Sequence, residues 1–343
     1  MNKRRMPAEW EPHKATWIAW PHNKKDWPEK FGPIPWVFAE IAYHISRFEQ
    51  VNIICNTPAD MKTAREACKA YGANLKNCRF LVKETDRVWL RDSGPTAIIE
   101  NGKVIWVCWD FNAWAKYKNF QRDRQIGRFI AEKSGLSFEV ARRPDNQKPL
   151  VLEGGSIESN GAGTILVTKQ CFSSLGDQVR NPLFKSYDYA NAFRNYLGAE
   201  DIIWLEALSG DETSHVDNVA RFVAKDRIAL AYKFDPIGDH DRSCHNRQDL
   251  TDKGFDVLFL PCPQERKFWN TPVPASYANF YIGNGFVLVP TFNDPADGVA
   301  IQILKTAFPD REVIGIHCLD LVWGFGTIHC ATQQEPQSHQ VDC

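Results

Sequence analysis

The chain has 343 residues, 43% hydrophobic and 24% charged, which is the balance of a globular protein with a sizeable core and excludes disordered and fibrous classes. Lys and Arg number 41 against 42 Asp and Glu, so no net field gathers nucleic acid or acidic lipid, and we expect a small-molecule partner. No run approaches the roughly 18 to 20 apolar residues that span a bilayer. The ten cysteines include no C-x-x-C pair, and no apolar stretch follows the basic N-terminal start, so we expect a reducing, cytoplasmic setting.

A helical pattern followed by a short β-branched or aromatic run recurs along the chain. The helical patterns cover residues 59–71, 122–133, 186–196, 240–252 and 296–307. The strand-like runs behind them cover 79–82, 138–141, 201–205, 256–260 and 312–316, and further runs occupy 104–109, 164–168, 228–232 and 286–289. The helix starts are nearly evenly spaced, by about 60 residues, which predicts five α/β units in a single domain, residues 1–343. A doubly wound nucleotide-binding sheet is the competing arrangement, but the chain has neither a G-x-G-x-x-G motif after a strand nor a P-loop.

Four segments carry residue types suited to catalysis. We expect Asp92 at the end of a short strand before a turn, and Glu153 in a similar place before two glycines that let a ligand or another backbone approach. Alternation predicts that His215 and Asp217 point to one side of an extended segment. Cys330 follows a glycine-led segment. Each also has a plainer interpretation: a turn former, a tight turn, a structural or metal-binding H-x-D pair, and a buried apolar cysteine.

The spacing of these segments favours a shared site. Asp92 and Glu153 are separated by about the length of one unit, and so are Glu153 and His215, whereas His215 and Cys330 are separated by about twice that length. One functional side chain therefore falls in each unit, with the fourth unit skipped. In a ring of five equivalent units such positions face a common axis, so we expect the side chains to converge there.

The expected cluster combines carboxylates, one histidine and one cysteine, without the further His or Cys ligands of a tetrahedral zinc site. We therefore expect neither a metal nor another cofactor. Paired carboxylates suit a planar cation with several N–H donors, which a guanidinium fits best. A thiolate at Cys330 is then placed to attack the central carbon of that group.

At these residues the sequence resembles the agmatine deiminase family of the guanidine-modifying (pentein) superfamily, which also includes bacterial-type peptidylarginine deiminases. The similarity runs nearly end to end. The blocks that carry it are residues 6–13 and 16–21, the W-x-R-D-x-G-P segment at 89–95, and residues 152–156, 215–217, 275–282 and 328–334.

The resemblance implies a five-fold pseudosymmetric α/β propeller and covalent catalysis. Cys330 is implied to attack the guanidinium carbon while Asp92 and Asp217 hold its nitrogens. Glu153 is implied to hold the group and assist proton movement, and His215 to protonate the departing ammonia and then activate water. Trp89 and Asp211 fall where relatives contact substrate. A homodimer is expected by analogy with relatives.

Three places depart from the pattern of relatives that act on agmatine. Ser214 stands where they usually have Gly, Arg87 where they have an acid, and residues 324–327 read G-F-G-T in place of G-G-G-N. Arg87 is either a cation at the mouth of the site, where it repels an ammonium or attracts a carboxylate, or an exposed surface arginine. The first hypothesis is hydrolysis of agmatine to N-carbamoylputrescine and ammonia, which feeds polyamine synthesis. The alternatives are deimination of arginine, peptidyl arginine or another guanidine, transfer of the amidino group to an amine, and a non-catalytic guanidinium-binding or metal-binding protein.

Overall fold

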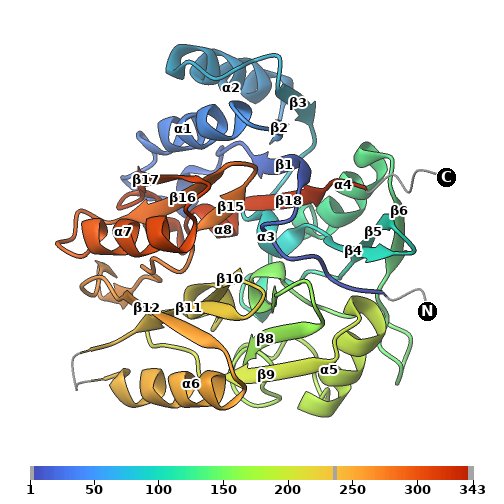
Figure 1. Ribbon diagram of the computed structural model, residues 1–343. Helices are drawn as coiled ribbons and strands as arrows, with labels where there is room; N and C mark the ends of the chain where they lie inside the picture. The colour runs from blue at the N-terminus through green and yellow to red at the C-terminus, as the bar shows by residue number, and fades with distance from the viewer. Residues whose placement is uncertain (1–3, 235–237, 339–343) are drawn as a thin grey trace.

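The computed structural model describes residues 4–234 and 238–338, and it shows five α/β units arranged in a ring around a central axis (Figure 1). Each unit has its own small sheet of three or four strands. The units follow one another around the ring in chain order, from blue through green to red. The mixed α/β fold and the five predicted units are confirmed.

Four units share one strand order. The middle strand runs antiparallel to the strand before it and parallel to the strand after it, with a helix in the parallel connection. The second unit contains β4 (Thr96–Glu100), β5 (Lys103–Cys108), α4 (Ile126–Ser134) and β6 (Ser137–Val140). The third contains β7 (Glu158–Ser159), β8 (Thr164–Thr168), α5 (Ser186–Ala192), the π-helical turn η5 (Phe193–Leu197) and β9 (Asp201–Leu205). The fourth contains β10 (Ala220–Ala224), β11 (Arg227–Tyr232), α6 (His240–Asp252) and β12 (Asp256–Pro261), and the fifth contains β15 (Tyr281–Gly283), β16 (Phe286–Thr291), α7 (Asp297–Ala307) and β17 (Glu312–His317).

The first unit is larger and closes the ring. It runs through β1 (His13–Ala19), α1 (Ile34–Ser46), β2 (Gln50–Cys55), α2 (Pro58–Tyr71) and β3 (Cys78–Val82). Its fourth strand, β18 (Thr332–Pro336), comes from the other end of the described chain and pairs antiparallel with β1. This pairing joins the last segment of the ring to the first. The sequence patterns predict α2 and β3 but not the β1–α1–β2 segment in front of them.

Local chemistry explains why these elements begin and end where they do. Thr57 caps α2 by accepting the amide N–H of Asp60, and Pro58 takes the first helical position, where no N–H is needed. Gly72 ends the helix with a φ of 99°, a left-handed conformation that costs glycine little. The middle strand β16 is buried at five of its six residues, as expected for a strand covered on both faces.

Short helical turns precede the first strands of several units, and they carry the candidate site residues. Asp92 lies in α3 (Leu90–Ser93) before β4, and Glu153 immediately precedes the 3₁₀ helix η4 (Gly154–Ser156) before β7. His215 immediately precedes η6 (Val216–Asn218) before β10, and Cys330 lies in α8 (Ile328–Ala331) before β18. The prediction of a strand-end acid at Asp92 is therefore wrong. His215 itself has the predicted extended backbone and faces the same point as Asp217, but residues 216–218 form a 3₁₀ turn and do not continue an extended segment. All four candidate residues are buried.

The remaining described elements are short and lie in the connections. They are the 3₁₀ helices η1 (Lys24–Asp26), η2 (Ala113–Ala115), η3 (Asp123–Gln125) and η7 (Leu321–Gly324), and the hairpin strands β13 (Lys267–Phe268) and β14 (Thr271–Pro272).

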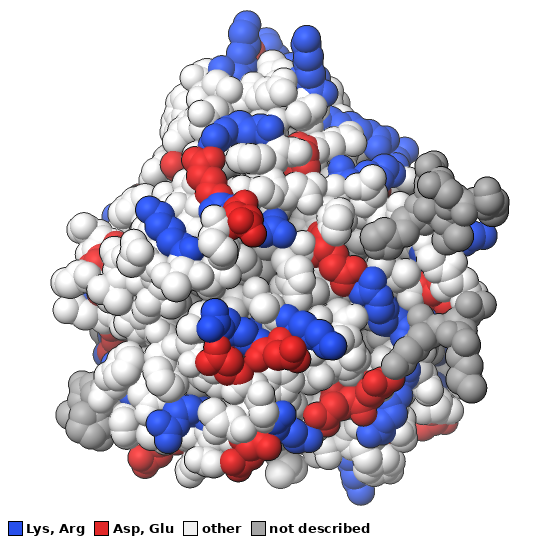
Figure 2. Space-filling view, viewed as in Figure 1, with Lys and Arg blue, Asp and Glu red and all other residues white. Residues whose placement is uncertain are grey.

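Figure 2 shows charged side chains of both signs scattered over this face, several of them side by side, in keeping with the near-zero net charge. Within residues 4–234 and 238–338, no helix has both the length and the apolar character that a membrane span requires.

Candidate active site

The four turns that carry the predicted residues meet at the centre of the ring, where Figure 1 shows α3 and α8 between the units. The backbone of Gly155 marks the meeting point. A Cβ added there would lie 2.7 Å from Nδ1 of His215, 2.9 Å from Oδ1 of Asp92 and 3.0 Å from Oδ2 of Asp217. Any residue other than glycine collides with all three groups. The close approach that the glycine pair predicts is thus present, and it is made by the site's own side chains.

Cys330 completes the cluster, although it lies in α8, close to the C-terminal end of the described residues. Its Sγ lies 3.8 Å from Oδ2 of Asp217, and only 6% of the residue is exposed. Burial raises the pKa of the thiol well above its usual value, and the negative charges of Asp217 and Asp92 raise it further. In the free protein Cys330 is therefore a neutral thiol. A cation bound beside Asp217 and Asp92 offsets their negative charges and so lowers the pKa of the thiol.

Asn279 is a functional candidate that the sequence patterns do not reveal. Its Nδ2 donates to Sγ of Cys330 at 3.2 Å, while its Oδ1 accepts from the hydroxyl of Thr327 at 2.6 Å and from the Cys330 amide at 3.3 Å. These contacts fix the amide so that an N–H group points at the sulfur. Asn279 shortly precedes the first strand of the fifth unit, and it follows Asp217 by about the length of one unit. A similar interval separates Glu153 from His215. Asn279 therefore occupies the position in the repeat that is expected from the sequence to lack a functional side chain.

Asp217 keeps one oxygen free for a ligand. Its Oδ2 accepts from Nδ1 of His329 at 2.8 Å, whereas its Oδ1 is buried and has no partner within the described chain. Burial raises the pKa of this carboxyl, but the hydrogen bond and the charge of His329 outweigh burial and hold the pKa below its usual value. A buried, ionised oxygen without a donor costs free energy until a donor arrives.

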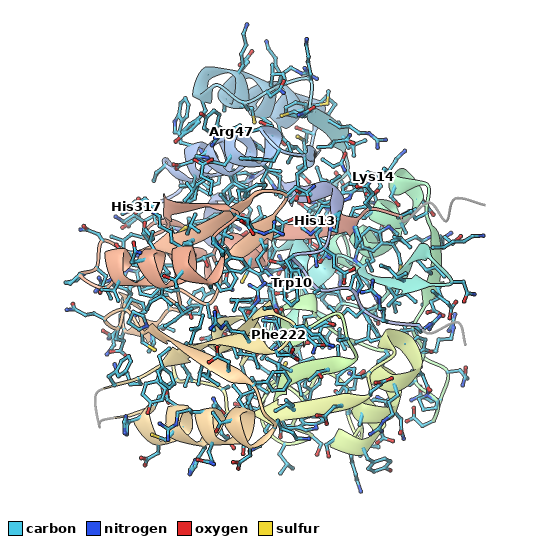
Figure 3. All side chains as sticks on the ribbon, viewed as in Figure 1. Trp10, His13, Lys14, Arg47, Phe222 and His317 are labelled. Carbon is cyan, nitrogen blue, oxygen red and sulfur yellow. The ribbon has the colours of Figure 1, made fainter. Side chains whose placement is uncertain are left out.

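Behind this pair lies a buried ionic network that centres on Glu9. Its Oε2 lies 2.9 Å from Nε2 of His329 and 3.2 Å from a nitrogen of Arg91, and its Oε1 accepts from Arg221 at 2.8 Å. The N-terminal block thus enters the middle of the ring, where Figure 3 shows the neighbouring Trp10 between the units. The two ring nitrogens of His329 contact Glu9 and Asp217, so His329 links this network to Asp217. The sequence patterns single out neither Glu9 nor His329 as a site residue.

Asp92 is held by the site on two sides. Its Oδ1 accepts the amide of Gly155 at 3.2 Å, and its Oδ2 accepts Nε1 of Trp114 at 3.0 Å. Burial raises the pKa of Asp92 to about 6; His215 opposes the rise, and the charges of Asp217 and Glu153 add to it. Trp114 reaches Asp92 from η2, in which all three residues have φ between 51° and 57°. Three successive non-glycine residues in the left-handed region are costly, and such strain is characteristic of functional positions.

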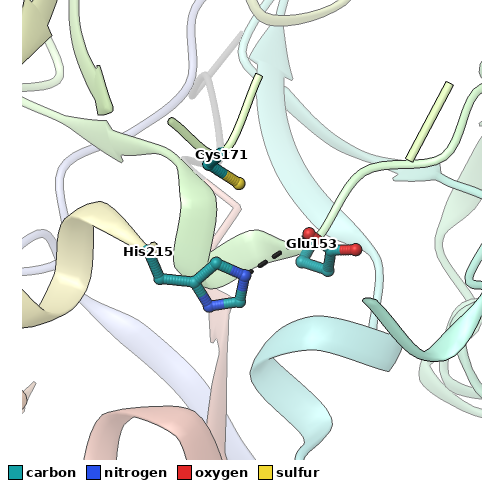
Figure 4. Close-up of side chains that lie close together, drawn as sticks. All are labelled: Glu153, Cys171 and His215. Atoms are coloured by element: carbon teal, nitrogen blue, oxygen red, sulfur yellow. Dashed lines mark hydrogen bonds and ion pairs between the residues drawn. The ribbon is translucent and has the colours of Figure 1, made fainter. Parts of the chain in front are cut away.

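His215 sits between Asp92 and Glu153. Its Nε2 lies 3.3 Å from Oε2 of Glu153, drawn as a dashed line in Figure 4, and its Nδ1 lies 3.7 Å from Oδ1 of Asp92. Burial lowers the pKa of His215, but the charge of Asp92 and the hydrogen bond to Glu153 outweigh burial and raise the pKa to about 9. The imidazole is therefore protonated at neutral pH and can act as an acid.

Glu153 is kept ionised by Arg180. The guanidinium Nε of Arg180 lies 3.3 and 3.2 Å from the two carboxylate oxygens. Burial raises the pKa of Glu153, but the charge of Arg180 and the hydrogen bond to His215 outweigh it and lower the pKa. Glu153, His215 and Cys171 could each offer one metal ligand within 4.8 Å of one another (Figure 4). The Glu153 carboxylate of this group is already paired with both Arg180 and His215.

A cavity of about 150 Å³ lies next to the cluster, and both predicted substrate-contact residues line it. Trp89 and Asp211 both form part of its wall. Asp211 also holds the catalytic turn, because its Oδ2 accepts the His215 amide at 2.9 Å and Nδ2 of Asn218 at 3.0 Å. The indole of Trp114 lines the same cavity, which therefore opens directly from the Asp92 side of the cluster.

The three departures from the agmatine-type pattern have different structural meanings. Ser214 and Phe325 have φ of 58° and 66°, so they adopt the left-handed backbone that the usual glycines favour and leave the chain path unchanged. Phe325 adds a ring to the wall of the cavity. Arg87 also lines the cavity and is only 7% exposed, so the interpretation as an exposed surface arginine is wrong.

The ring of five units around a buried cysteine and carboxylates places the chain among the guanidine-modifying enzymes of the pentein superfamily. The chain belongs to the Porphyromonas-type peptidyl-arginine deiminase family, whose model matches residues 5–336. It is 34% identical to an agmatine deiminase of Pseudomonas aeruginosa, over 97% of this chain and 95% of that protein. Two solved structures are similar throughout. An agmatine deiminase of C. jejuni with substrate bound has a TM-score of 0.86 and 27% identity, covering 98% of this chain and 97% of the other. An agmatine deiminase of Enterococcus faecalis has a TM-score of 0.86 and 29% identity, covering 98% and 96%.

Proposed function

We propose that this protein is an agmatine deiminase that hydrolyses agmatine to N-carbamoylputrescine and ammonia through a covalent intermediate on Cys330. The observation that carries the proposal is the buried thiol beside Oδ2 of Asp217, whose other oxygen, Oδ1, is buried without a partner in the described chain, with Asp92 alongside. A guanidinium supplies what this site lacks: N–H donors for the two carboxylates and a positive charge beside the thiol. The relatives named agmatine deiminases support agmatine as the substrate.

In the first half of the reaction, Asp92 and Asp217 hold the guanidinium nitrogens. The bound cation offsets the charges that keep the thiol protonated, so Cys330 releases its proton to solvent, where ammonia later takes up a proton to become ammonium, and Sγ attacks the central carbon. The Nδ2 group of Asn279 stabilises the sulfur as it gains charge. Protonated His215 gives its proton to the departing nitrogen; the C–N bond breaks, ammonia leaves, and an S-alkylthiouronium remains on Cys330.

In the second half, water takes the place of ammonia. His215, now neutral, accepts a proton from water, and Glu153 stabilises the imidazolium that forms. The water oxygen bonds to the thiouronium carbon, the C–Sγ bond breaks, and N-carbamoylputrescine is released. The second proton of the water passes to Sγ as the C–Sγ bond breaks, so the neutral thiol and the protonated histidine are restored for the next cycle.

The direct test is incubation of the purified protein with agmatine alone. We expect ammonia and N-carbamoylputrescine in equal amounts, with no added amine. Arginine and a short arginine peptide, assayed in parallel by ammonia release, serve as competing substrates and should be turned over more slowly. Absence of agmatine turnover would contradict the proposal, and turnover that requires an added amine would indicate amidino transfer instead.

The product leads to putrescine, so the proposal places the enzyme in polyamine synthesis. We also propose a cytoplasmic setting, which is supported by the nine cysteines of the described residues, all of them free thiols. The homodimer implied by the resemblance is part of the proposal and rests on that resemblance alone.

A further inference from the structure

The cavity beside the catalytic cluster contains a carboxylate whose function the reaction above does not explain. Asp26 lies at the end of η1 and lines the cavity together with Trp89 and Trp114. Its Oδ1 accepts Nδ2 of Asn23 at 2.9 Å, but its Oδ2 is buried and has no hydrogen-bond partner within residues 4–234 and 238–338. A buried carboxylate oxygen without a donor is costly unless a ligand completes it.

The other acids of the cavity are already engaged. Asp211 accepts from the amides of Thr213 and His215 and from Asn218. Glu212 forms an ion pair with Lys116 across the mouth. Asp26 is therefore the acid of this cavity that retains an unpartnered, buried oxygen among the described residues.

Arg87 is a cation whose charge acts on Asp26, but its hydrogen bonds are directed elsewhere. Its two terminal nitrogens donate to the backbone oxygen of Asn119 at 2.7 Å and to the side-chain oxygen of the same residue at 3.0 Å. Its guanidinium carbon lies 4.5 Å from the ring centre of Tyr117, and its Nη1 lies 3.8 Å from Oδ2 of Asp123. These contacts hold Arg87 in the wall, and within the described residues no hydrogen bond joins it to Asp26.

The groups that line the cavity suit an elongated substrate that has a polar group at each end and a methylene chain between them. Trp114 lines the cavity and donates to Asp92, which we place on the guanidinium. The indoles of Trp89 and Trp114 give an apolar wall for a methylene chain, and Asp26 offers an unpartnered oxygen in the same space. A compact primary ammonium, with three donors and one charge, is the group that completes such an oxygen.

We propose that Asp26 is the specificity-determining residue that binds the primary ammonium at the far end of the substrate. This inference rests on the proposed function and adds the residue that selects an aminoalkyl guanidine over an amino-acid guanidine. Burial raises the pKa of Asp26 to about 7, with the charge of Arg87 opposing the rise and that of Asp86 adding to it. An arriving ammonium favours the ionised carboxylate and is bound in return.

The test compares agmatine with n-butylguanidine, which keeps the guanidinium and the four-carbon chain but lacks the ammonium. We expect Asp26→Asn to lower kcat/KM for agmatine by about 10- to 100-fold, the scale of a lost charged hydrogen bond, and to change kcat/KM for n-butylguanidine less than about twofold. Lys24→Ala alters the same turn outside the cavity and is the matched control; it should leave both values unchanged. Equal losses for both compounds, or no loss for agmatine, would overturn the assignment.

Binding separates this proposal from the proposed function. Calorimetry with Cys330→Ala protein, which cannot turn agmatine over, measures affinity without chemistry. Adding Asp26→Asn to that protein should weaken agmatine binding by about 10- to 100-fold. If the wild-type enzyme does not hydrolyse agmatine but binding still depends on Asp26, the proposed function fails and the ammonium site stands. If Asp26→Asn leaves the affinity unchanged, or if agmatine does not bind, the ammonium site is refuted.

Discussion

Cys330→Ala is expected to lower kcat for agmatine by on the order of 10⁴- to 10⁶-fold, the scale seen when a covalent nucleophile is removed. The sulfur is the only atom of this residue that the mechanism uses, and no other described group reaches the same position between Asn279 and Asp217. The fold should persist, because a small buried side chain is replaced by a smaller one, and the free energy of unfolding should change by about 1–2 kcal/mol or less. Steady-state ammonia release and urea unfolding measure the two effects.

Cys171→Ala is the matched control for this change. Cys171 is also a buried free thiol, and it lies close to Glu153 and His215 (Figure 4). It does not face Asp217, and we expect its replacement to retain kcat within about tenfold, as a change in packing near a site does. A large loss in Cys171→Ala together with a small loss in Cys330→Ala would reverse the assignment of the nucleophile.

The second large effect is expected for Glu153→Gln. Glu153 bonds to His215 and carries the charge that helps to keep the imidazole protonated, so its loss should lower kcat by about 10²- to 10⁴-fold, the contribution of general acid–base catalysis. The pH profile should change as well. Ammonia release needs protonated His215, whose pKa is raised to about 9, so kcat/KM of the wild-type enzyme should fall as pH rises through about 9.

In Glu153→Gln this fall should move to lower pH, because a hydrogen bond and a charge that raise the His215 pKa are removed. The same raised pKa links protonation to stability: the contribution of His215 is complete below its unfolded-state value of about 6.5 and is lost as pH rises toward about 9. Glu206→Gln removes a similar carboxylate outside the site, where it pairs with Lys169, and should not move the profile. An unchanged basic limb in Glu153→Gln would refute this role for His215.

Much of the fold could be predicted from sequence because each unit is a local pattern. The predicted helix at 240–252 and the predicted strands at 164–168 and 201–205 coincide with α6, β8 and β9. The segments around the site are predicted less well. A four-residue turn such as α3 is too short to show a helical period, so Asp92 reads as a strand end.

The site is predictable only in part for a related reason. The regular spacing of the units is enough to predict that four residues converge on one site: Asp92, Glu153, His215 and Cys330. Asn279 has no titratable group to draw notice, but it lies within the family block at 275–282, and its spacing to Asp217 could have singled it out. The network around Glu9 cannot be inferred from spacing, because it joins the N-terminal segment to His329 across almost the whole chain. The hydrogen bonds of Arg87 likewise go to a separate loop, the one that contains Asn119.

The most direct test of the account is the mass of the intact protein after acid quenching during turnover of agmatine. We expect a transient adduct whose added mass equals that of agmatine less one ammonia. It should be located on the peptide that contains Cys330 and be absent from Cys330→Ala. Turnover of agmatine with no adduct at any quench time, or an adduct on another cysteine, would contradict the central claim that Cys330 attacks the guanidinium carbon.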